Sequence, residues 1–228
     1  MPMKLKERKS SDPYLRTIWR SETTGEEYLN IPAKSGWDII VVENSNGTTV
    51  QLSAPLGRPQ RIRVGTPGTI SRFTGLRFAA GVYVVGMQSE LQSKNTIELR
   101  VTGDSFEMAG EIFAIPTYDS AEKLTVTARK LRVLLRDESI DGALTNPEST
   151  PPTRTMQRHF LRKTDMSKSQ ALQLQRAEHV ASLLNQGMKL ADAAVAAGYA
   201  DQAHMTRTFK VLYGTTPLAF YKEYGAKD

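Results

Sequence analysis

The chain contains no cysteine among its 228 residues. This absence excludes disulfides, thiolate zinc sites, cysteine nucleophiles and thiol redox sensing. Histidine is almost as scarce, and the three histidines, His159, His179 and His204, all lie in the last 70 residues. A histidine-ligated metal site or a histidine-based triad therefore cannot be built in the first two thirds of the chain.

Long apolar runs are also missing. The longest, such as residues 81–87, are far shorter than the roughly 20 residues that span a bilayer. The N-terminus is charged and no apolar stretch follows it, so we expect no signal peptide. These features predict a cytoplasmic protein without a membrane partner.

Positive charge is concentrated in one half of the chain. The net charge is +6, and residues 1–120 carry +1 of it while residues 121–228 carry +5. Such an excess is typical of a surface that meets a polyanion, although many basic faces are only solvated. The length allows one large domain or two small ones, with 39% hydrophobic residues to build a core.

Residues 1–120 predict a β-rich domain. The Asn46-Gly47 pair between the apolar runs 37–43 and 48–52 predicts a hairpin with a type I′ turn. Frequent Gly and Pro between short strands favour a small barrel or sandwich. Further strands are expected at 61–64, 69–73, 76–85 and 96–101, and a short helix at 105–114.

From residue 121 the pattern becomes helical, so we place the domain boundary between residues 120 and 121. Helices are expected at 125–136, 153–163, 168–186, 189–197, 201–213 and 217–224. Residues 146–152 (NPESTPP) break any helix. The predicted fold class is α+β, a β-rich domain followed by an all-α domain.

Residues 188–213 predict a helix-turn-helix. An apolar stripe of small residues marks the first helix, at Leu190, Ala193, Ala194 and Ala197. Gly198 suits the left-handed position that ends this helix, and Asp201 suits the cap of the next one. The second helix would bury Met205, Phe209 and Leu212 and expose Ala203, Thr206, Arg207 and Lys210, with His204 beside this face.

The frame Met-x-Arg-x-Phe occurs twice, 49 residues apart, at 156–160 and 205–209. The exposed face of the first copy comprises Arg154, Gln157 and Arg158, with Arg162 on its flank. The helix expected at 168–186 would fix the separation of the two copies. Together they predict two helix-turn-helix motifs joined by a linker helix, able to read successive major grooves about 34 Å apart.

The exposed residue types suit base reading. Arg can bridge O6 and N7 of guanine, Gln can bridge N6 and N7 of adenine, and Ala or Thr can touch a thymine methyl. Phosphate contacts, which set register and make affinity salt-dependent, are expected from the lysines Lys163, Lys168, Lys189 and Lys210.

These residues also carry a family resemblance. The stretch 193–220, A-A-x-x-x-G-Y-A-D-Q-A-H-M-T-R-T-F-K-x-x-x-G-T-T-P-x-x-F, closely resembles the second helix-turn-helix of AraC-type transcription regulators. The stretch 154–160, R-T-M-Q-R-H-F, resembles the first. Residues 139–152 depart from that family's pattern, because they are short of apolar positions and rich in helix breakers. More loosely, 75–81 (GLRFAAG) resembles the small β domain that precedes the DNA-binding unit in a subgroup of these regulators.

The resemblance implies a sequence-specific transcription regulator whose second helix in each motif reads double-stranded DNA. Carried over position by position, it implies that the reading residues are Arg154, Gln157, Arg158, Gln202, Ala203, Thr206 and Arg207. It implies no catalytic residue, no metal site and no cofactor; a DNA-repair relative would need a methyl-accepting Cys. Candidate partners besides DNA are a small-molecule effector at residues 1–120, RNA polymerase and a second copy of the chain.

Two alternatives remain open at this stage. The β domain could be a sugar-binding module or an enzyme with a basic helical appendage, or the chain could be a non-specific architectural DNA binder. Within the β domain, Arg77 is either one half of a buried structural pair or a ligand anchor.

Overall fold

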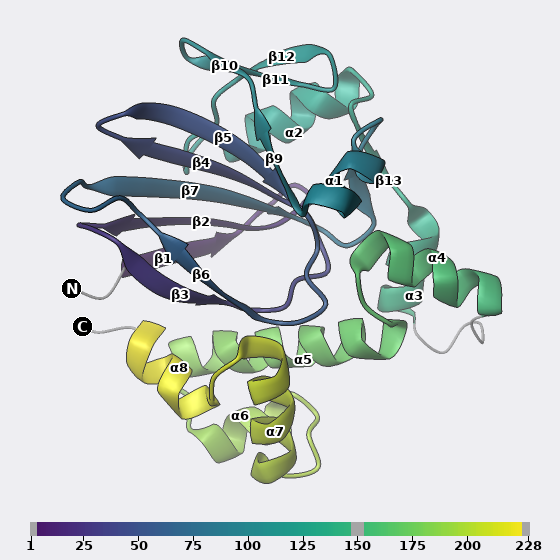
Figure 1. The fold of residues 1–228 in the computed structure, drawn as a ribbon. Helices are drawn as coiled ribbons and strands as arrows, with labels where there is room; N and C mark the ends of the chain where they lie inside the picture. Colours follow the sequence, from purple (N-terminus) through teal and green to yellow (C-terminus); the bar gives the residue numbers. More distant parts are fainter. Residues whose placement is uncertain (1–3, 147–152, 225–228) are drawn as a thin grey trace.

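The computed structural model describes residues 4–146 and 153–224 (Figure 1). A β-rich N-terminal region is followed by a helical C-terminal region, which confirms the α+β prediction. The expected helix breaker at 146–152 lies almost wholly outside the described residues.

A six-stranded antiparallel sheet dominates the N-terminal region. Its strand order is β1 (Lys4–Lys9), β2 (Leu15–Thr23), β7 (Ser71–Phe78), β4 (Asp38–Asn44), β5 (Gly47–Ser53) and β9 (Thr96–Leu99). Three smaller sheets pair β3 (Glu27–Ile31) with β6 (Gln60–Val64), β8 (Val82–Val84) with β13 (Leu134–Arg136), and β10 (Val101–Thr102) with β11 (Ser105–Met108) and β12 (Glu111–Ala114).

The helices follow the first eight strands, and most of them lie in the C-terminal half of the chain. They are α1 (Gln88–Lys94), α2 (Ala121–Lys130), α3 (Glu138–Thr145), α4 (Arg154–Thr164), α5 (Lys168–Asn185), α6 (Leu190–Ala196), α7 (Gln202–Tyr213) and α8 (Pro217–Tyr224). The five helices expected between 153 and 224 are confirmed to within a residue or two at each end. Helices α1 and α3 were not predicted.

The expected hairpin between β4 and β5 forms, but its turn is not the predicted one. Asn44 pairs with Gly47, so the turn residues are Ser45 and Asn46. Neither has a positive φ, which a type I′ turn needs at both positions. Instead, the side chain of Asn44 accepts a hydrogen bond from the backbone N–H of Asn46 at 2.8 Å and so stabilises a different turn.

Gly75 does not separate two strands as expected, because β7 runs through it. It pairs with Trp19 of β2, and a Cβ at this glycine would lie 1.9 Å from the Trp19 ring. Gly75 is therefore a packing glycine within the strand that makes room for an indole.

The helix predicted at 105–114 is wrong, because these residues form the β11–β12 hairpin. Its turn residues Ala109 and Gly110 both have positive φ, 53° and 82°. Such a turn suits the right-handed twist of the paired strands. The alternating burial of Phe106 and Met108 follows the two-residue period of a strand.

The helix predicted at 125–136 is only partly right. Helix α2 begins at Ala121 and ends at Lys130, and Arg132 follows with a φ of 57°. The next residues pair with β8 as β13, which buries Val133 and Leu134 in the core of the N-terminal region.

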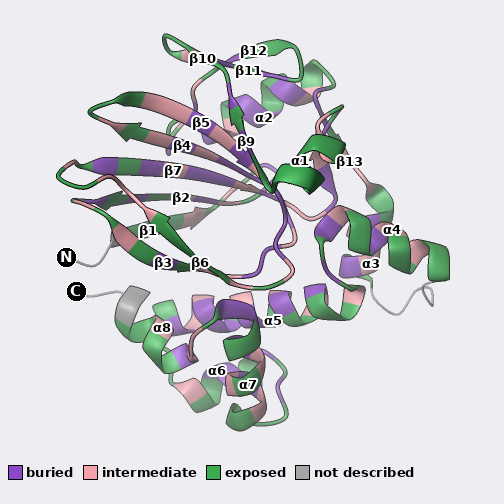
Figure 2. Cartoon of the chain, viewed as in Figure 1, coloured by how far each residue is buried: buried purple, intermediate pink, exposed green. Residues whose placement is uncertain are grey.

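Buried side chains form two clusters (Figure 2). The first joins the large sheet with α2 and β13, so residues 121–136 pack with the β-rich region. The second joins the helices from α3 onwards and takes in Ala33 from the loop after β3. The long helix α5 runs along this second cluster and contacts α3, α4, α6, α7 and α8.

Candidate nucleic-acid interface

Helices α6 and α7 form the predicted helix-turn-helix. Ala193 and Ala194 are buried, so their small side chains let α7 approach closely. Gly198 has a φ of 73°, the left-handed conformation expected of it. Asp201 caps α7, and its side chain accepts the backbone N–H of His204 at 2.6 Å. This hydrogen bond holds the pKa of the Asp201 carboxyl below its usual value.

The inward face of α7 fixes how the helix lies. Met205, Phe209 and Leu212 are buried as predicted. The Phe209 ring stacks on Tyr213, with 4.1 Å between ring centroids, and meets Phe220 of α8 edge-on. The outward face of α7 is thereby turned to solvent.

Of the six residues predicted to face DNA in this unit, four are exposed: Gln202, Ala203, Arg207 and Lys210. His204 and Thr206 are half-buried. The ring of His204 meets Tyr199 edge-on, with centroids 5.4 Å apart. The structure thus brings the six together on one short helix.

Helix α3 occupies the segment whose composition departs from the family pattern. Its cap is Asp137, whose side chain accepts the backbone N–H of Ser139 at 3.2 Å. Ile140 and Leu144 are buried, and they suffice to pack a helix of eight residues against the second cluster. The first motif therefore has a supporting helix.

Helix α4 presents the first predicted reading face. Thr153 caps the helix by accepting the backbone N–H of Met156 at 3.3 Å. Phe160 is buried against the second cluster, while Met156 is only half-buried. All four predicted contact residues are exposed: Arg154, Gln157, Arg158 and Arg162.

The two helices align at the 49-residue offset, although Met156 is half-buried where Met205 is buried. Phe160 corresponds to Phe209 and both are buried. Arg158 corresponds to Arg207 and both are exposed. At the same offset Leu161 corresponds to Lys210, and Leu161 is 52% exposed. Leu161 was not among the predicted contact residues, although the 49-residue repeat alone points to it.

The back of α4 is attached to the residues before it. The ring Nε2 of His159 lies 2.6 Å from a carboxylate oxygen of Asp137, and a guanidinium nitrogen of Arg162 lies 3.3 Å from the other ring nitrogen. Burial opposes the charge on Asp137, but hydrogen bonds from Ser139 and His159 outweigh it and hold the pKa of Asp137 below its usual value.

The end of α4 is held by the β-rich region. The ammonium of Lys163 lies 4.1 Å from the centroid of the Tyr83 ring, so this lysine has a cation–π partner where a phosphate contact was expected. Gln92 of α1 donates to the backbone carbonyl of Arg162 at 2.8 Å. The backbone N–H of Gly57 donates to Asp165 at the same distance.

Helices α5 and α7 also contact the β-rich region. Arg16 of β2 forms an ion pair with Glu178 of α5. The backbone N–H of Ala33 donates to the carbonyl of Leu212 at 2.8 Å. This hydrogen bond joins the loop after β3 to α7 beside the second cluster.

Arg77 is half-buried and forms a structural ion pair with the buried Asp38. Two of its guanidinium nitrogens donate to the Asp38 carboxylate at 3.0 and 3.2 Å, and the buried ammonium of Lys34 donates to Asp38 at 2.9 Å. Burial lowers the pKa of Lys34 despite this partner. Asp38 thus neutralises part of the charge on two cations within the sheet.

The described residues contain no group of three His, Cys, Asp or Glu side chains that could hold a metal ion. No helix among them is long and apolar enough to cross a membrane.

Comparison with known proteins agrees with this geometry. Residues 152–223, which span α4 to α8, match the family described as "Helix-turn-helix domain". No curated protein matches the chain. Among solved structures, ToxT from Vibrio cholerae is similar at a TM-score of 0.53 with 9% identity, over 99% of this chain and 100% of that one.

Unsaturated-fatty-acid-bound ToxT from Vibrio cholerae is similar at a TM-score of 0.50 with 12% identity, over 100% of this chain and 98% of that one. At such low sequence identities, the likeness to these structures concerns the fold alone. The assignment to a family rests on residues 152–223. Residues 152–223 therefore form an AraC-type helix-turn-helix domain, and this domain supports a role in DNA binding and transcription regulation.

Proposed function

We propose that the chain is a sequence-specific regulator that inserts α4 and α7 into successive major grooves of DNA. The observation that carries this proposal is the pair of helices that bury Phe160 and Phe209, expose Arg158 and Arg207, and both pack on α5. Helix α5 has 18 residues, which corresponds to a length of about 27 Å. A rigid spacer of this size is of the same order as the separation of about 34 Å between successive grooves.

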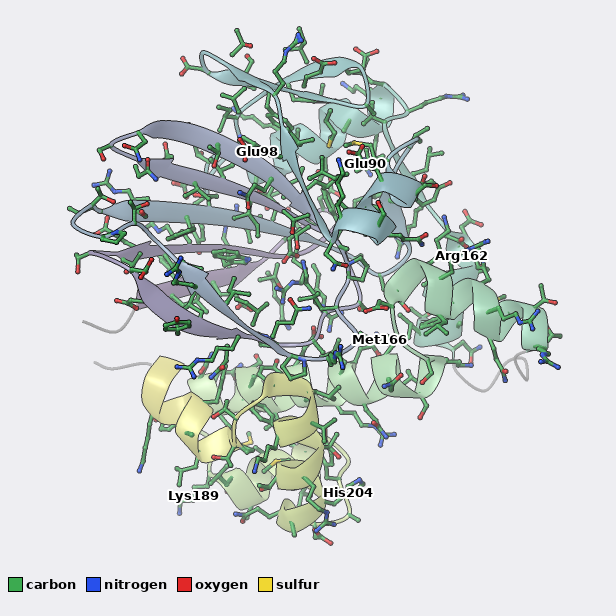
Figure 3. All side chains as sticks on the ribbon, viewed as in Figure 1. Glu90, Glu98, Arg162, Met166, Lys189 and His204 are labelled. Carbon is green, nitrogen blue, oxygen red and sulfur yellow. The ribbon has the colours of Figure 1, made fainter. Side chains whose placement is uncertain are left out.

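Base reading is assigned to the exposed residues of the two faces. Arg158 and Arg207 would each bridge a guanine, Gln157 and Gln202 would reach adenines, and Ala203 and Thr206 would touch thymine methyls. Lys189 and Lys210 would contact phosphates and make binding salt-dependent. Figure 3 shows Arg162 at α4, on the other side of α5 from Lys189 and His204.

The N-terminal region modulates DNA binding by holding α4. The axes of α4 and α7 are far from parallel in Figure 1. Helix α4 must therefore turn relative to α7 before both can enter grooves on one side of DNA. The contacts of His159 with Asp137 and of Lys163 with Tyr83 oppose such a turn. An effector that weakened them would shift the population towards the DNA-binding arrangement.

The clusters suggest where the two functional parts meet. Because α2 and β13 pack with the sheet and α3 packs with the second cluster, we place the regulatory unit up to Asp137 and the DNA-binding unit from Glu138 onwards. The fatty acid in one ToxT structure makes fatty acids the first effector class to screen. Stabilisation of the full chain in a thermal-shift screen would support an effector site.

Selection of binding sites from random duplexes tests the proposal. The wild type should enrich one motif with two half-sites about one helical turn apart. Arg158→Ala should relax one half-site and Arg207→Ala the other. A wild type that binds all duplexes alike in a salt-dependent manner would favour the architectural alternative and overturn this one.

A further inference from the structure

Leu161 is a large aliphatic residue on the face of α4 to which DNA reading was assigned. It follows Arg158 by three residues, Gln157 by four and Arg154 by seven, and these are the spacings of one helix face. A singly exposed leucine is ordinary on a protein surface, so its exposure alone implies nothing. Its position within the reading face needs an explanation.

The repeat supplies the direction of this side chain. Because α4 and α7 bury corresponding phenylalanines, Phe160 and Phe209, Leu161 leaves α4 in the direction in which Lys210 leaves α7. A lysine there suits a phosphate. A leucine can make no hydrogen bond, and the apolar group that base edges present in the major groove is the C5-methyl of thymine.

The rest of the described structure leaves this position open. The contacts that hold α4 come from His159 and Lys163, which lie four residues apart on another side of the helix, and from the backbone carbonyl of Arg162. The side chain of Leu161 remains 52% exposed beside them.

We propose that Leu161 contacts a thymine methyl in the half-site read by α4, so that this half-site requires thymine at one position. In the half-site read by α7, Lys210 stands at the matching position, so the base pair that corresponds to this one has no requirement for thymine. This inference rests on the proposed function of α4 as a reading helix.

Replacement of thymine by deoxyuridine removes only the methyl group and tests the contact. The α4 half-site is first identified in the selected duplex by its response to Arg158→Ala, and each thymine in it is then replaced in turn. We expect one replacement to weaken wild-type binding about threefold to fivefold, the effect of one buried methyl. Leu161→Ala should bind the two duplexes equally, and Leu161→Met should restore the preference for thymine.

Ile112→Ala is the matched control, because Ile112 is 75% exposed on β12. This variant should lose as much DNA-binding affinity as the wild type when thymine is replaced by deoxyuridine. Alanine favours helices, so Leu161→Ala keeps α4 intact. The inference is overturned if Leu161→Ala loses as much affinity as the wild type when thymine is replaced by deoxyuridine. It is also overturned if no such replacement weakens wild-type binding in a half-site that depends on Arg158. In both cases the proposed function stands. If no motif is selected, the proposed function itself fails.

Discussion

Arg207 and Lys189 show how two cations in one motif can act differently. Arg207 is exposed on the outward face of α7, and Lys189 is exposed just before α6. A guanidinium that bridges one guanine carries sequence information, whereas an ammonium near the backbone meets the same phosphate on every duplex.

We predict that Arg207→Ala costs about 1–3 kcal/mol on the selected duplex and relaxes specificity at one base pair. Lys189→Ala should weaken binding to all duplexes alike and lower the slope of affinity against salt by about one. Binding of single-base variants at several salt concentrations measures both. A uniform loss in Arg207→Ala would remove this residue from base reading.

Asp38 is the carboxylate partner of two cations, the buried Lys34 and the partly buried Arg77. It is buried and accepts hydrogen bonds from both Lys34 and Arg77. Removing its charge leaves the buried Lys34 and the partly buried Arg77 without their carboxylate partner.

We therefore expect Asp38→Asn to lower the free energy of unfolding by roughly 3–5 kcal/mol, as measured by urea denaturation. Glu43→Gln is the control, because Glu43 is exposed on the same strand and its replacement should change little. Equal free energies of unfolding for the two variants would show that the charge of Asp38 does not stabilise the fold through Lys34 and Arg77.

At the scale of elements, Glu122 ties α2 to the edge of the sheet. Its carboxylate accepts two hydrogen bonds from the Arg8 guanidinium of β1, at 2.6 and 2.9 Å. These bonds lower the pKa of Glu122 from 4.5 to about 2. Because the pKa is lower in the folded state, the stabilisation is complete above the unfolded value and is lost as the pH falls towards the folded one.

The wild type should accordingly lose more stability than Glu122→Gln between pH 4.5 and about 2. Urea midpoints measured across this range test the difference. A variant of the exposed residue Glu98, Glu98→Gln, should instead follow the wild type. Parallel curves for Glu122→Gln and the wild type would rule out this pair as a source of acid sensitivity.

At the scale of the whole molecule, the contact between Asp137 and His159 links α4 to the start of α3. Asparagine caps helices about as well as aspartate, so Asp137→Asn keeps the cap of α3 while it removes the charge that faces His159. The variant therefore isolates the attachment of α4.

We expect Asp137→Asn to bind the selected duplex about threefold to tenfold more tightly, because α4 turns more readily. Asp104→Asn controls for the lost negative charge, since Asp104 is exposed in the N-terminal region. An equal gain in both variants would assign the effect to net charge and would contradict restraint of α4.

The helix-turn-helix at 188–213 could be predicted from the sequence because its causes are local. The stripe of alanines, the left-handed Gly198 and the cap Asp201 act within a few residues of one another. The 49-residue repeat likewise predicts which faces of α4 and α7 are exposed, since each helix needs one buried stripe.

Other features depend on partners far along the chain. The β11–β12 hairpin forms where a helix was expected because Phe106, Met108 and Phe113 pack into the core of the sheet, and that packing overrides local preference. Gly75 extends its strand instead of ending it, because Trp19 lies across from it. Neither effect can be read from neighbours in sequence.

The sequence by itself determined the two amphipathic helices, their spacing and the residues that they expose, because helix periodicity and caps act over a few residues. Only the tertiary structure decided how α4 is held. His159 meets Asp137, and Lys163 meets Tyr83, across 22 and 80 positions of chain. The physical reason is that such contacts form only when the whole chain packs, and no local pattern specifies which distant partners then meet.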